Sequence, residues 1–440
     1  MSAAYNRRQF LNQIAAAGAA APIAASAAQE RTAKPMDKVR IGFVGVGGRG
    51  RGDLRNLLKL DGVEIRAVCD IVESNVVRAQ KMVTDAGQPQ PQSYSRGDTD
   101  YKRLCARDDL DLVFTATPWR WHTPVCVEAM KSGKHAASEV PIAVTLEECW
   151  ELVETSEQTG RYCVQMENCN YDRVELMVLN MVRQKLLGDL LHARCGYLHD
   201  LRAGKFNDRG GRKLWRLEHS LRRNGDLYPT HGLGPVAQCL NINRGNQFDH
   251  MVAMSSKPQS LHEFAVARFG PESPQAKLDI ALGDVVTSLI RTRAGQTIIV
   301  SHDTNTPRPY SRDYMIQGTK GLVRKYPHAK IHLDGKSPGH EWEDLIENYA
   351  AQYEHPLWRE LQEKAKGSGH GGMDFIEAYR LVYCLRNGQP LDTDVYDGAA
   401  LCAVSELSER SIAGNSRTVD FPDFTRGDWM KRKPLGIVTA

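Results

Sequence analysis

Residues 39–70 read VRIGFVGVGGRGRGDLRNLLKLDGVEIRAVCD, and this stretch decides the first half of the fold. An apolar run meets the spacing Gly45-x-Gly47-x-x-Gly50, and an amphipathic segment and a second apolar run ending in Asp70 follow. In a dinucleotide-binding βαβ unit the first glycine permits a tight turn. The second lets the backbone approach a pyrophosphate, and the third lets helix and strand pack closely. The pattern therefore predicts a pyrophosphate at the N-terminus of the helix.

Asp70 indicates which dinucleotide is bound. It lies twenty residues after Gly50, where a carboxylate can hydrogen-bond a ribose 2′-hydroxyl. Its charge would repel a 2′-phosphate, so the sequence favours NAD over NADP.

Length and composition are those of a globular protein with more than one domain. The chain has 440 residues, 41% hydrophobic and 25% charged, with a formal charge of +4. This small, dispersed charge gives no case for a nucleic-acid partner. No apolar run after residue 33 is long enough to cross a bilayer, so a membrane span is not expected.

The N-terminus carries an export pattern. Asn6-Arg7-Arg8-Gln9-Phe10-Leu11 is a twin-arginine sequence. An alanine-rich stretch follows, and Ala25-Ser26-Ala27 supplies the small residues that a signal peptidase accepts. Residues 1–33 are therefore predicted to be a signal peptide and linker for twin-arginine export, which would place the mature protein in the periplasm.

Strands alternate with helices over residues 34–168. The expected elements include strands at 110–118, 135–141 and 162–168, and helices over 122–133 and from the capping box Thr145-x-x-Glu148 to about 159. This alternation predicts an α/β Rossmann domain with a doubly wound parallel sheet. Ligands of such sheets bind outside the carboxyl ends of the strands.

Residues 169–440 show a different pattern, with strand-like runs joined by turns. This pattern predicts an α+β substrate-binding domain with a large mixed or antiparallel sheet. A helix is expected over 172–188, and closing helices over 373–387 and 395–412. Strand-like runs occur at 190–198, 251–255, 285–293, 296–302 and 313–317. The insert 200–227 shows no clear period and is expected to be a loop.

Four clusters could carry chemistry. They are Trp119-Arg120-Trp121-His122, Glu139-Val140-Pro141, Tyr228-Pro229-Thr230-His231-Gly232 and Arg308-Pro309-Tyr310. The spacing of Tyr228 and His231 puts both on one face if the segment is helical. Imidazole titrates near neutrality and is the commonest proton-transfer group. A structural salt bridge is an alternative role for Glu139.

These motifs resemble a known family. The chain resembles the glucose–fructose oxidoreductase superfamily, and more closely its NAD-dependent glycosidase branch, glycoside hydrolase family 109, whose known activity is α-N-acetylgalactosaminidase. The likeness rests on GFVGVGGRGRG (42–52), TPWRWH (117–122), SEVP (138–141), MEN (166–168), GYLHDLR (196–202), LWRLEH (214–219), RNGDLYPTHGLGP (223–235), NINRG (241–245), HDTNTPRPY (302–310), GHGGMDF (369–375) and VDFPDFTRG (419–427).

The resemblance implies particular roles for residues. Cofactor contacts with NAD are implied for the glycine turn and the strand ends: Gly45, Gly47, Gly48, Arg49, Gly50, Asp70, Trp119, Arg120, Trp121, His122, Glu139, Val140, Asn168 and Tyr228. Substrate contacts are implied for Tyr197, Arg216, Tyr228, Pro229, Thr230, His231 and Tyr310. No metal is expected, and the partner is a small-molecule or glycan substrate. A homodimer is a further possibility.

The implied reaction hydrolyses a glycoside, with an α-N-acetylgalactosaminide as the leading candidate. It runs by NAD-dependent transient oxidation at C3, elimination, addition of water and re-reduction, so tightly bound NAD is regenerated in each turnover. His231 and Tyr228 are the expected catalytic residues, with His231 as base at O3. Tyr228 and Tyr197 are the candidates for the C2 base and the leaving-group acid, with Glu139 as a group that could orient them.

Two other functions fit parts of the sequence. One is an NAD(P)-dependent sugar oxidoreductase of the same superfamily. Most of these relatives have Glu-Lys-Pro where this chain has Glu139-Val140-Pro141, and the missing lysine disfavours that alternative. The other is a non-catalytic sugar or nucleotide sensor, against which the intact Tyr228 and His231 argue.

Overall fold

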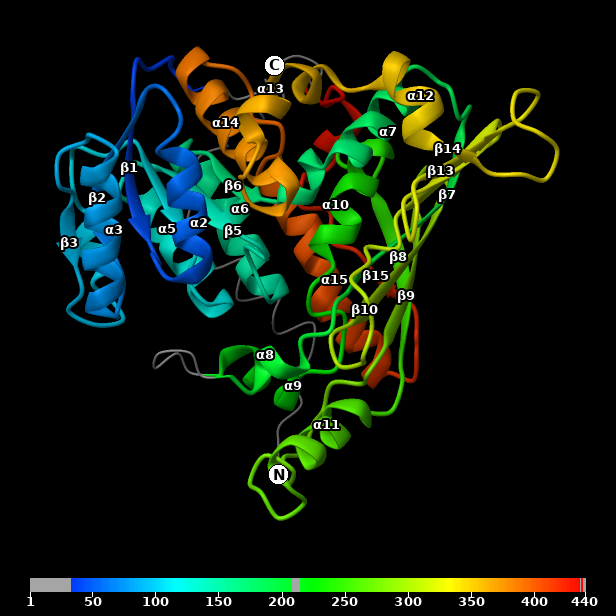
Figure 1. Ribbon diagram of the computed structural model, residues 1–440, viewed down its shortest axis with the longest axis horizontal. Coiled ribbons are helices and arrows are strands. Elements are labelled where there is room, and N and C mark those ends of the chain that lie inside the picture. Colours follow the sequence, from blue (N-terminus) through cyan, green and yellow to red (C-terminus); the bar gives the residue numbers. More distant parts are fainter. Residues whose placement is uncertain (1–32, 208–213, 436, 438–440) are drawn as a thin grey trace, which may run out of the picture. The chain divides into compact units, whose positions relative to one another are not determined.

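Two β-sheets organise the part of the chain that the computed structural model describes, which is residues 33–207, 214–435 and 437. Figure 1 shows the two sheets with helices between and around them. The twin-arginine segment and its expected cleavage site lie outside these residues. Among the described helices, none is both long and apolar enough to span a membrane.

The first sheet is parallel and has the strand order β3-β2-β1-β4-β5-β6. Its strands are β1 (Val39–Val44), β2 (Val63–Cys69), β3 (Gln92–Tyr94), β4 (Leu112–Thr115), β5 (His135–Glu139) and β6 (Cys163–Met166). This is the order of a doubly wound dinucleotide-binding fold. The predicted Rossmann sheet is confirmed.

Helices cover both faces of this sheet because side chains of a strand alternate between faces. Val39, Ile41 and Phe43 pack in one apolar cluster with helices α2, α3 and α14, while Val44 belongs to the cluster on the opposite side. The helices on the two faces are α2 (Gly48–Leu57), α3 (Glu73–Asp85), α14 (Met373–Asn387), α4 (Tyr101–Cys105), α5 (His122–Lys131) and α6 (Leu146–Thr159). The C-terminal part of the chain thus supplies α14 to one face of the Rossmann sheet.

The second sheet is mixed and has nine strands in the order β14-β13-β12-β11-β7-β10-β9-β8-β15. Only β7 and β10 pair in parallel. The strands are β7 (Leu190–Leu198), β8 (Phe248–Ser255), β9 (Val286–Thr292), β10 (Thr297–Asp303), β11 (Met315–Gly318), β12 (Gly321–Arg324), β13 (Lys330–Leu333), β14 (Glu343–Asp344) and β15 (Val419–Asp420). All five predicted strands are present. Strands β12–β15 were not predicted, because each is too short to show an alternation of apolar and polar residues.

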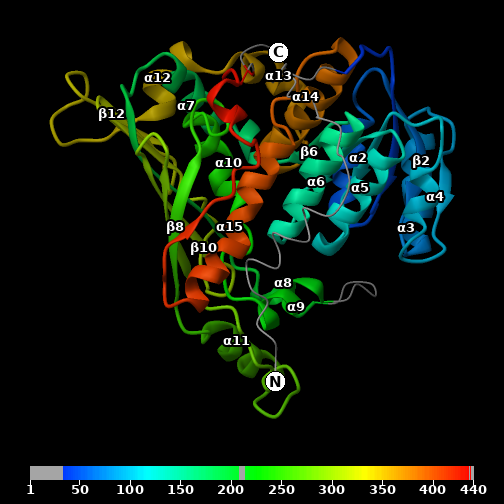
Figure 2. The same cartoon turned by 180° about the vertical axis from the view of Figure 1, so that it is seen from behind.

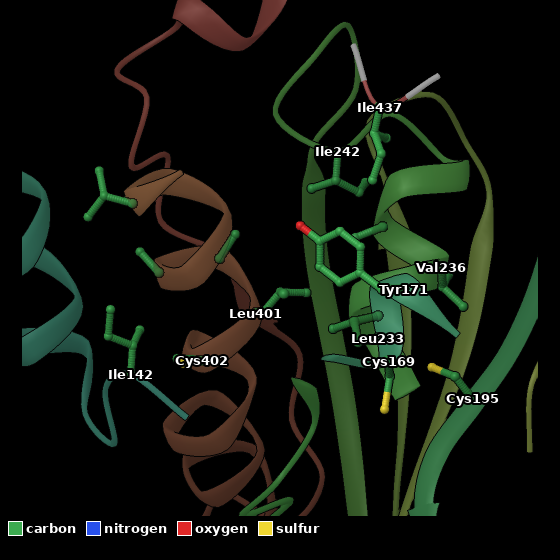
Figure 3. Close-up of a cluster of buried hydrophobic side chains, with 14 of the residues drawn as sticks. Ile142, Cys169, Tyr171, Cys195, Leu233, Val236, Ile242, Leu401, Cys402 and Ile437 are labelled. Atoms are coloured by element: carbon green, nitrogen blue, oxygen red, sulfur yellow. The ribbon is translucent and has the colours of Figure 1, made fainter. Parts of the chain in front are cut away.

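Helices α7 (Arg173–Arg183), α10 (Thr230–Cys239) and α15 (Val395–Ala413) fill the space between the sheets. Both views show α15 running beside α6 on one side and β8 on the other (Figures 1 and 2). Leu233 and Val236 of α10 meet Tyr171 and Leu401 in one apolar cluster (Figure 3). A single core therefore joins the two sheets.

The insert 200–227 was expected to be a loop, and this is wrong. It contains α8 (Arg202–Lys205) and α9 (Trp215–Arg222), on either side of residues 208–213. Leu217 of α9 is buried against Leu261 and Ile280. With only two turns of helix, the apolar spacing is too short to stand out from the surrounding arginines. Helices α11 (Ser260–Phe269), α12 (Leu345–Tyr353) and α13 (Pro356–Ala365) were also not predicted.

Candidate active site

The glycine turn has the geometry that its spacing predicts. Gly45 has φ +85°, and a Cβ there would lie 2.8 Å from the backbone of Ala116 and Thr117. A Cβ on Gly50 would collide with the carbonyl oxygen of Gly45. The first glycine is thus required for the turn and the third for the close approach of α2 to β1.

The start of α2 fits a dinucleotide phosphate. Gly47 is the N-cap, and no side chain in the described residues caps this helix; its first turn holds no acidic residue. The N–H groups of that turn carry partial positive charge and suit a pyrophosphate. Asp70 follows β2, is half-buried, and accepts a hydrogen bond from Val72 N–H at 2.9 Å. The residues present therefore fit NAD.

Arg49 links the glycine turn after β1 and the ends of β5 and β6 to α14. Its guanidinium donates to Glu139 Oε1, with Nε at 2.8 Å, and to Asp374 Oδ2 at 2.7 Å. Asn168 Nδ2 donates to Asp374 Oδ1 at 2.6 Å, and His370 Nδ1 lies 2.8 Å from Asp374 Oδ2. The alternative role of Glu139 as an ion-pair partner is therefore present. Arg49, Glu139 and Asn168, separately implied as cofactor contacts, meet around one aspartate.

Carboxyl groups outnumber cations in this Arg49 cluster. Asp53 and Glu377 are also buried here, each with one oxygen that has no partner among the described residues. Burial and the charge of Glu139 raise the pKa of both groups well above the usual range. Burial also opposes ionisation of Asp374, but its hydrogen bond with His370 and the charge of Arg49 hold its pKa below the usual range. These directions favour the protonated form of Asp53 and Glu377 and the ionised form of Asp374, which pairs with Arg49.

The segment Trp119-Arg120-Trp121-His122 divides its side chains. Trp119 stacks on Tyr228 with ring centroids 5.5 Å apart. Trp121 instead contacts Tyr101 of the Rossmann domain, and Arg120 lies exposed over the Trp121 ring. His122 is buried, and both its ring nitrogens lie 2.7 Å from backbone carbonyl oxygens. Trp119 is the member that reaches the substrate side, and contacts of the others with NAD stay a prediction.

Tyr228 and His231 lie side by side, although not on one helix. The helix α10 begins at Thr230, so Tyr228 belongs to the turn before it. Tyr228 Oη lies 3.5 Å from His231 Nε2. His231 Nδ1 lies 2.6 Å from Glu167 Oε1, and Glu167 is only 2% exposed. Because the carboxylate accepts from Nδ1–H, the tautomer follows from the partners, and Nε2 is left as a proton acceptor.

Glu167 remains ionised in this buried position. Burial opposes its charge, but His231 and the N–H of Cys169 lower its pKa. Glu167, Cys169 and His231 also form a potential metal-ligand group within the described chain. Glu167 Oε1 is already taken by His231 and by Cys169 N–H, and burial raises the pKa of the Cys169 thiol well above its usual value. This set suits proton transfer better than metal binding.

Aromatic rings wall the space around His231. Tyr197 lies 4.5 Å from Tyr228 and 5.5 Å from His231 between ring centroids, and its hydroxyl contacts His199 Nδ1 at 2.9 Å. Tyr310, which is 39% exposed, packs edge-on against Tyr197 and His199. Burial and the charge of Arg216 lower the pKa of His199. A neutral imidazole therefore backs the Tyr197 phenol.

One predicted role needs correction. Glu139 was a candidate to orient Tyr228 and Tyr197, but its carboxylate is turned to Arg49, and the carboxylate that orients His231 is Glu167. Pro229 and Thr230 are both buried, and their contacts with a substrate stay a prediction. Val140 is buried in the cluster of Trp119, Tyr197 and Tyr228.

Three residues without a predicted role belong to the site. They are Glu167, His199 and Asp374. Glu167 could have been found as an acid directly after a buried parallel strand, where ligands bind. His199 likewise follows β7 in GYLHDLR. Asp374 carries no such signal, because its distance from Arg49 in sequence is spanned only by the fold.

The chain thus combines an NAD-binding Rossmann domain with a second domain that presents an imidazole–carboxylate pair in an aromatic enclosure. This combination defines the class of NAD-binding carbohydrate enzymes. Residues 39–167 match the family described as "Oxidoreductase family, NAD-binding Rossmann fold", and residues 171–431 match "Glycosyl hydrolase 109, C-terminal domain". The chain belongs to glycosyl hydrolase family 109 and is a glycoside hydrolase.

Individual relatives agree. The chain is 48% identical over 405 residues to a glycosyl hydrolase family 109 protein of Shewanella pealeana, covering 92% of this chain and 89% of the relative. It is 47% identical over 413 residues to an alpha-N-acetylgalactosaminidase of Shewanella oneidensis, covering 93% and 90%. A levoglucosan dehydrogenase in complex with NADH shares the fold, with a TM-score of 0.66 at 20% identity over 88% of this chain and 100% of the other.

Proposed function

We propose that this protein is an α-N-acetylgalactosaminidase that works with tightly held NAD. The observation that carries the proposal is His231, held at Nδ1 by buried Glu167 and open at Nε2 toward Tyr228. The sugar preference is supported by the 47% identical relative from Shewanella oneidensis, which is named for that activity.

His231 is the base for the sugar hydroxyl at C3. Nε2 takes the O3 proton, and Glu167 stabilises the imidazolium that forms because its carboxylate is 2.6 Å from Nδ1. NAD, when bound, supplies a hydride acceptor at C3 and returns the hydride at the end of the cycle. Removal of the O3 proton by this chain is what makes C3 a hydride donor.

Two tyrosines are placed for the other proton transfers. Burial and the neighbouring Tyr197 raise the pKa of Tyr228 well above its usual value, so Tyr228 keeps its proton and is suited to protonate the leaving oxygen. Tyr197 contacts His199 Nδ1, which can take the phenol proton as Tyr197 removes the proton from C2. This divides the two roles between two tyrosines, each with its own imidazole.

The surrounding residues exclude water. Trp119, Tyr197 and Tyr228 are each less than a tenth exposed and pack against one another. A dry enclosure protects an unsaturated ketone until the leaving group has gone. The Arg49 cluster joins the glycine turn, β5 and β6 to α14, and this connection supports retention of NAD between turnovers.

One assay tests the function. Purified protein is incubated with p-nitrophenyl N-acetyl-α-galactosaminide without added nucleotide, and nitrophenol and NADH are both followed. We expect nitrophenol release without net NADH. Accumulation of NADH without nitrophenol release would instead indicate a sugar oxidoreductase. If neither product forms, and aryl glycosides of other sugars and anomers also give neither, the protein would be a sensor. Dinucleotide extracted from denatured protein should amount to about one molecule per chain.

We further propose twin-arginine export to the periplasm, from the pattern at residues 6–27. Export by this route carries folded proteins, which suits one that holds a nucleotide. Replacing Arg7 and Arg8 by lysine should retain the protein in the cytoplasm of a host with this pathway, as cell fractionation would show. A homodimer stays a prediction, and light scattering would measure it.

A further inference from the structure

A buried ion cluster behind Tyr310 has no role in the reaction as proposed so far. It joins Arg312 and Lys325, from the loop before β11 and the end of β12, to Asp172 and Glu175 at the start of α7. The side chains of Arg312 and Glu175 are 3% and 1% exposed. A buried ion pair is weak evidence for stability, but it can fix the geometry of the segments that carry it.

The guanidinium of Arg312 is held from more than one side. Nη2 donates to Glu175 Oε1 at 2.6 Å and to Asp172 Oδ2 at 2.9 Å. Nη1 donates to the phenol oxygen of Tyr310 at 3.3 Å. The guanidinium carbon lies 5.9 and 5.8 Å from the ring centroids of Tyr310 and Tyr326. A planar fork of donors makes such contacts at once, whereas a lysine ammonium is a single point of charge.

The contact with Arg312 decides how the Tyr310 hydroxyl can act. Arginine only donates hydrogen bonds, so the phenol oxygen is the acceptor and its own proton is directed elsewhere. Burial raises the pKa of this phenol, although the charge of Arg312 opposes the shift, and the protonated form is favoured. Tyr310 is also 39% exposed. It therefore presents an O–H group that an oxygen of a bound sugar can accept.

The same cluster is attached to the segment behind the catalytic base. Asp172, which accepts from Arg312, caps α7 and ends the turn that begins directly after Glu167. Glu167 is the residue that orients His231. Arg312 thus connects the loop that carries Tyr310 to the segment that carries the orienting carboxylate.

We propose that Arg312 is a positioning residue, which fixes Tyr310 as a hydrogen-bond donor to an oxygen of the bound sugar. The inference rests on the proposed function and on the predicted contact of Tyr310 with the substrate. Arg312 is buried and acts on the sugar through Tyr310. A contact of this kind holds the sugar equally before and during the reaction, so its loss raises KM and leaves kcat nearly unchanged.

A double-mutant cycle on the NAD-loaded protein tests this role. Arg312→Lys keeps a positive charge on the carboxyl groups but does not also hold the phenol. It should raise KM for p-nitrophenyl N-acetyl-α-galactosaminide about tenfold, with kcat within about twofold of wild type. Tyr310→Phe should have a similar effect. Adding Arg312→Lys to Tyr310→Phe should raise KM by less than about twofold more, because the hydrogen bond is already absent.

A second buried arginine supplies the matched control. Arg380 is paired with Asp392, and both side chains are as buried as those of the cluster. Arg380→Lys should leave KM unchanged, whatever its effect on the melting temperature. If Arg312→Lys does not fold, Arg312→Met with Glu175→Gln, which removes a carboxyl group together with the cation, replaces it in the cycle.

Three outcomes would overturn the proposal. One is a KM for Arg312→Lys within about twofold of wild type. Another is an equal rise in KM with and without Tyr310→Phe, which would show a merely structural role. The third is a loss of kcat alone, which would place the effect at Glu167.

The result is separable from the proposed function. Nitrophenol release by the wild type, with any of these three outcomes, removes only the role of Arg312. If the wild type releases no nitrophenol, the proposed glycosidase activity fails, and the same cycle is measured as the Kd of free N-acetylgalactosamine by isothermal titration calorimetry. A wild-type protein that neither releases nitrophenol nor binds this sugar would overturn both proposals.

Discussion

Two buried groups of charges lie at the carboxyl edge of the Rossmann sheet, and they differ in the balance of charge. The Arg49 cluster sets one guanidinium among Asp53, Glu139, Asp374 and Glu377. The other group is a single carboxylate, Glu167, on a single imidazole, His231. In the first, surplus carboxyls stay protonated and the cation is held on several sides, which favours a rigid support. In the second, one ring nitrogen is fixed and the other is free, which favours proton transfer.

Two histidines of the predicted site motifs, His122 and His231, differ in a similar way. His122 has both ring nitrogens on backbone carbonyl oxygens, and burial lowers its pKa. His231 has one nitrogen on a carboxylate and the other at a long 3.5 Å contact with Tyr228. The presence of a histidine in a motif is therefore not enough to assign a catalytic role. The partners of its two ring nitrogens decide that role.

Removing the free imidazole should have the largest effect. His231→Ala should lower kcat for the aryl glycoside by about 10³-fold, because general acid–base groups contribute on that scale. Bound NAD should remain, as measured in denatured extracts. His250→Ala, a change at a partly exposed histidine of β8, is the control and should keep full activity. Activity near wild type in His231→Ala would remove this residue from catalysis.

Removing the cation of the Arg49 cluster should lower the stability of the fold. Arg49→Met should lower the free energy of unfolding in urea by about 3 kcal/mol, since it leaves buried carboxylates without their cation. Asp53→Asn should instead raise it at neutral pH, because the raised pKa of Asp53 means that folding must take up a proton that the amide does not need. Equal losses in the two variants would contradict the assignment of protons.

The pH dependence of stability tests whether Asp53 is protonated in the folded protein. Asp53 has a folded pKa raised above its unfolded value, so between these values the folded protein binds more protons than the unfolded chain. By linkage, the free energy of unfolding falls through this group as pH rises above about 4. Asp53→Asn should make the decline between pH 4 and 7 shallower, measured by urea unfolding at each pH. An unchanged slope would show that Asp53 is ionised throughout.

Glu167→Gln tests the carboxylate that orients His231. It should lower kcat by about 10²-fold with little change in KM, because the amide can hold the ring but does not stabilise the imidazolium. Glu167→Asp should recover part of the loss. The matched control is Glu263→Gln on the exposed side of α11. A KM effect alone would assign Glu167 to substrate binding.

The smallest expected effect is at the ribose. Asp70→Ser should weaken binding of NAD by about tenfold, equivalent to about 1.4 kcal/mol for one lost hydrogen bond to a charged group. The discrimination against NADP should shrink at the same time, because the repelling charge is gone. Titration of nucleotide-free protein with both dinucleotides would measure the two constants. An unchanged ratio would show that Asp70 does not read the 2′ position.

The Rossmann half could be predicted closely because its signals are local. Gly45, Gly50 and Asp70 are conformational and spacing requirements that lie within one βαβ unit. The helix over 373–387 and the strand over 190–198 were also found from their own periodicity. The eight-residue helix α9 was missed because two turns with several arginines give too little pattern. The alternation of apolar residues likewise fails in strands of two to four residues.

The active site was predicted only in part, since contacts between distant segments leave no pattern in sequence. Tyr228 and His231 are three residues apart, and their proximity was predicted. Glu167 is 64 residues from His231, and Asp374 is 325 from Arg49. The carboxylate that orients His231, Glu167, was therefore not predicted.

The sequence by itself determined the dinucleotide turn, the alternation of strands and helices, and the residue types able to move protons. These follow from backbone sterics and from the apolar period of each segment, which neighbours along the chain decide. The tertiary structure alone decided which carboxyl groups favour their protonated form and which imidazole nitrogen is left free. Those properties depend on burial and on charges a few ångströms away, and only the folded chain brings them together.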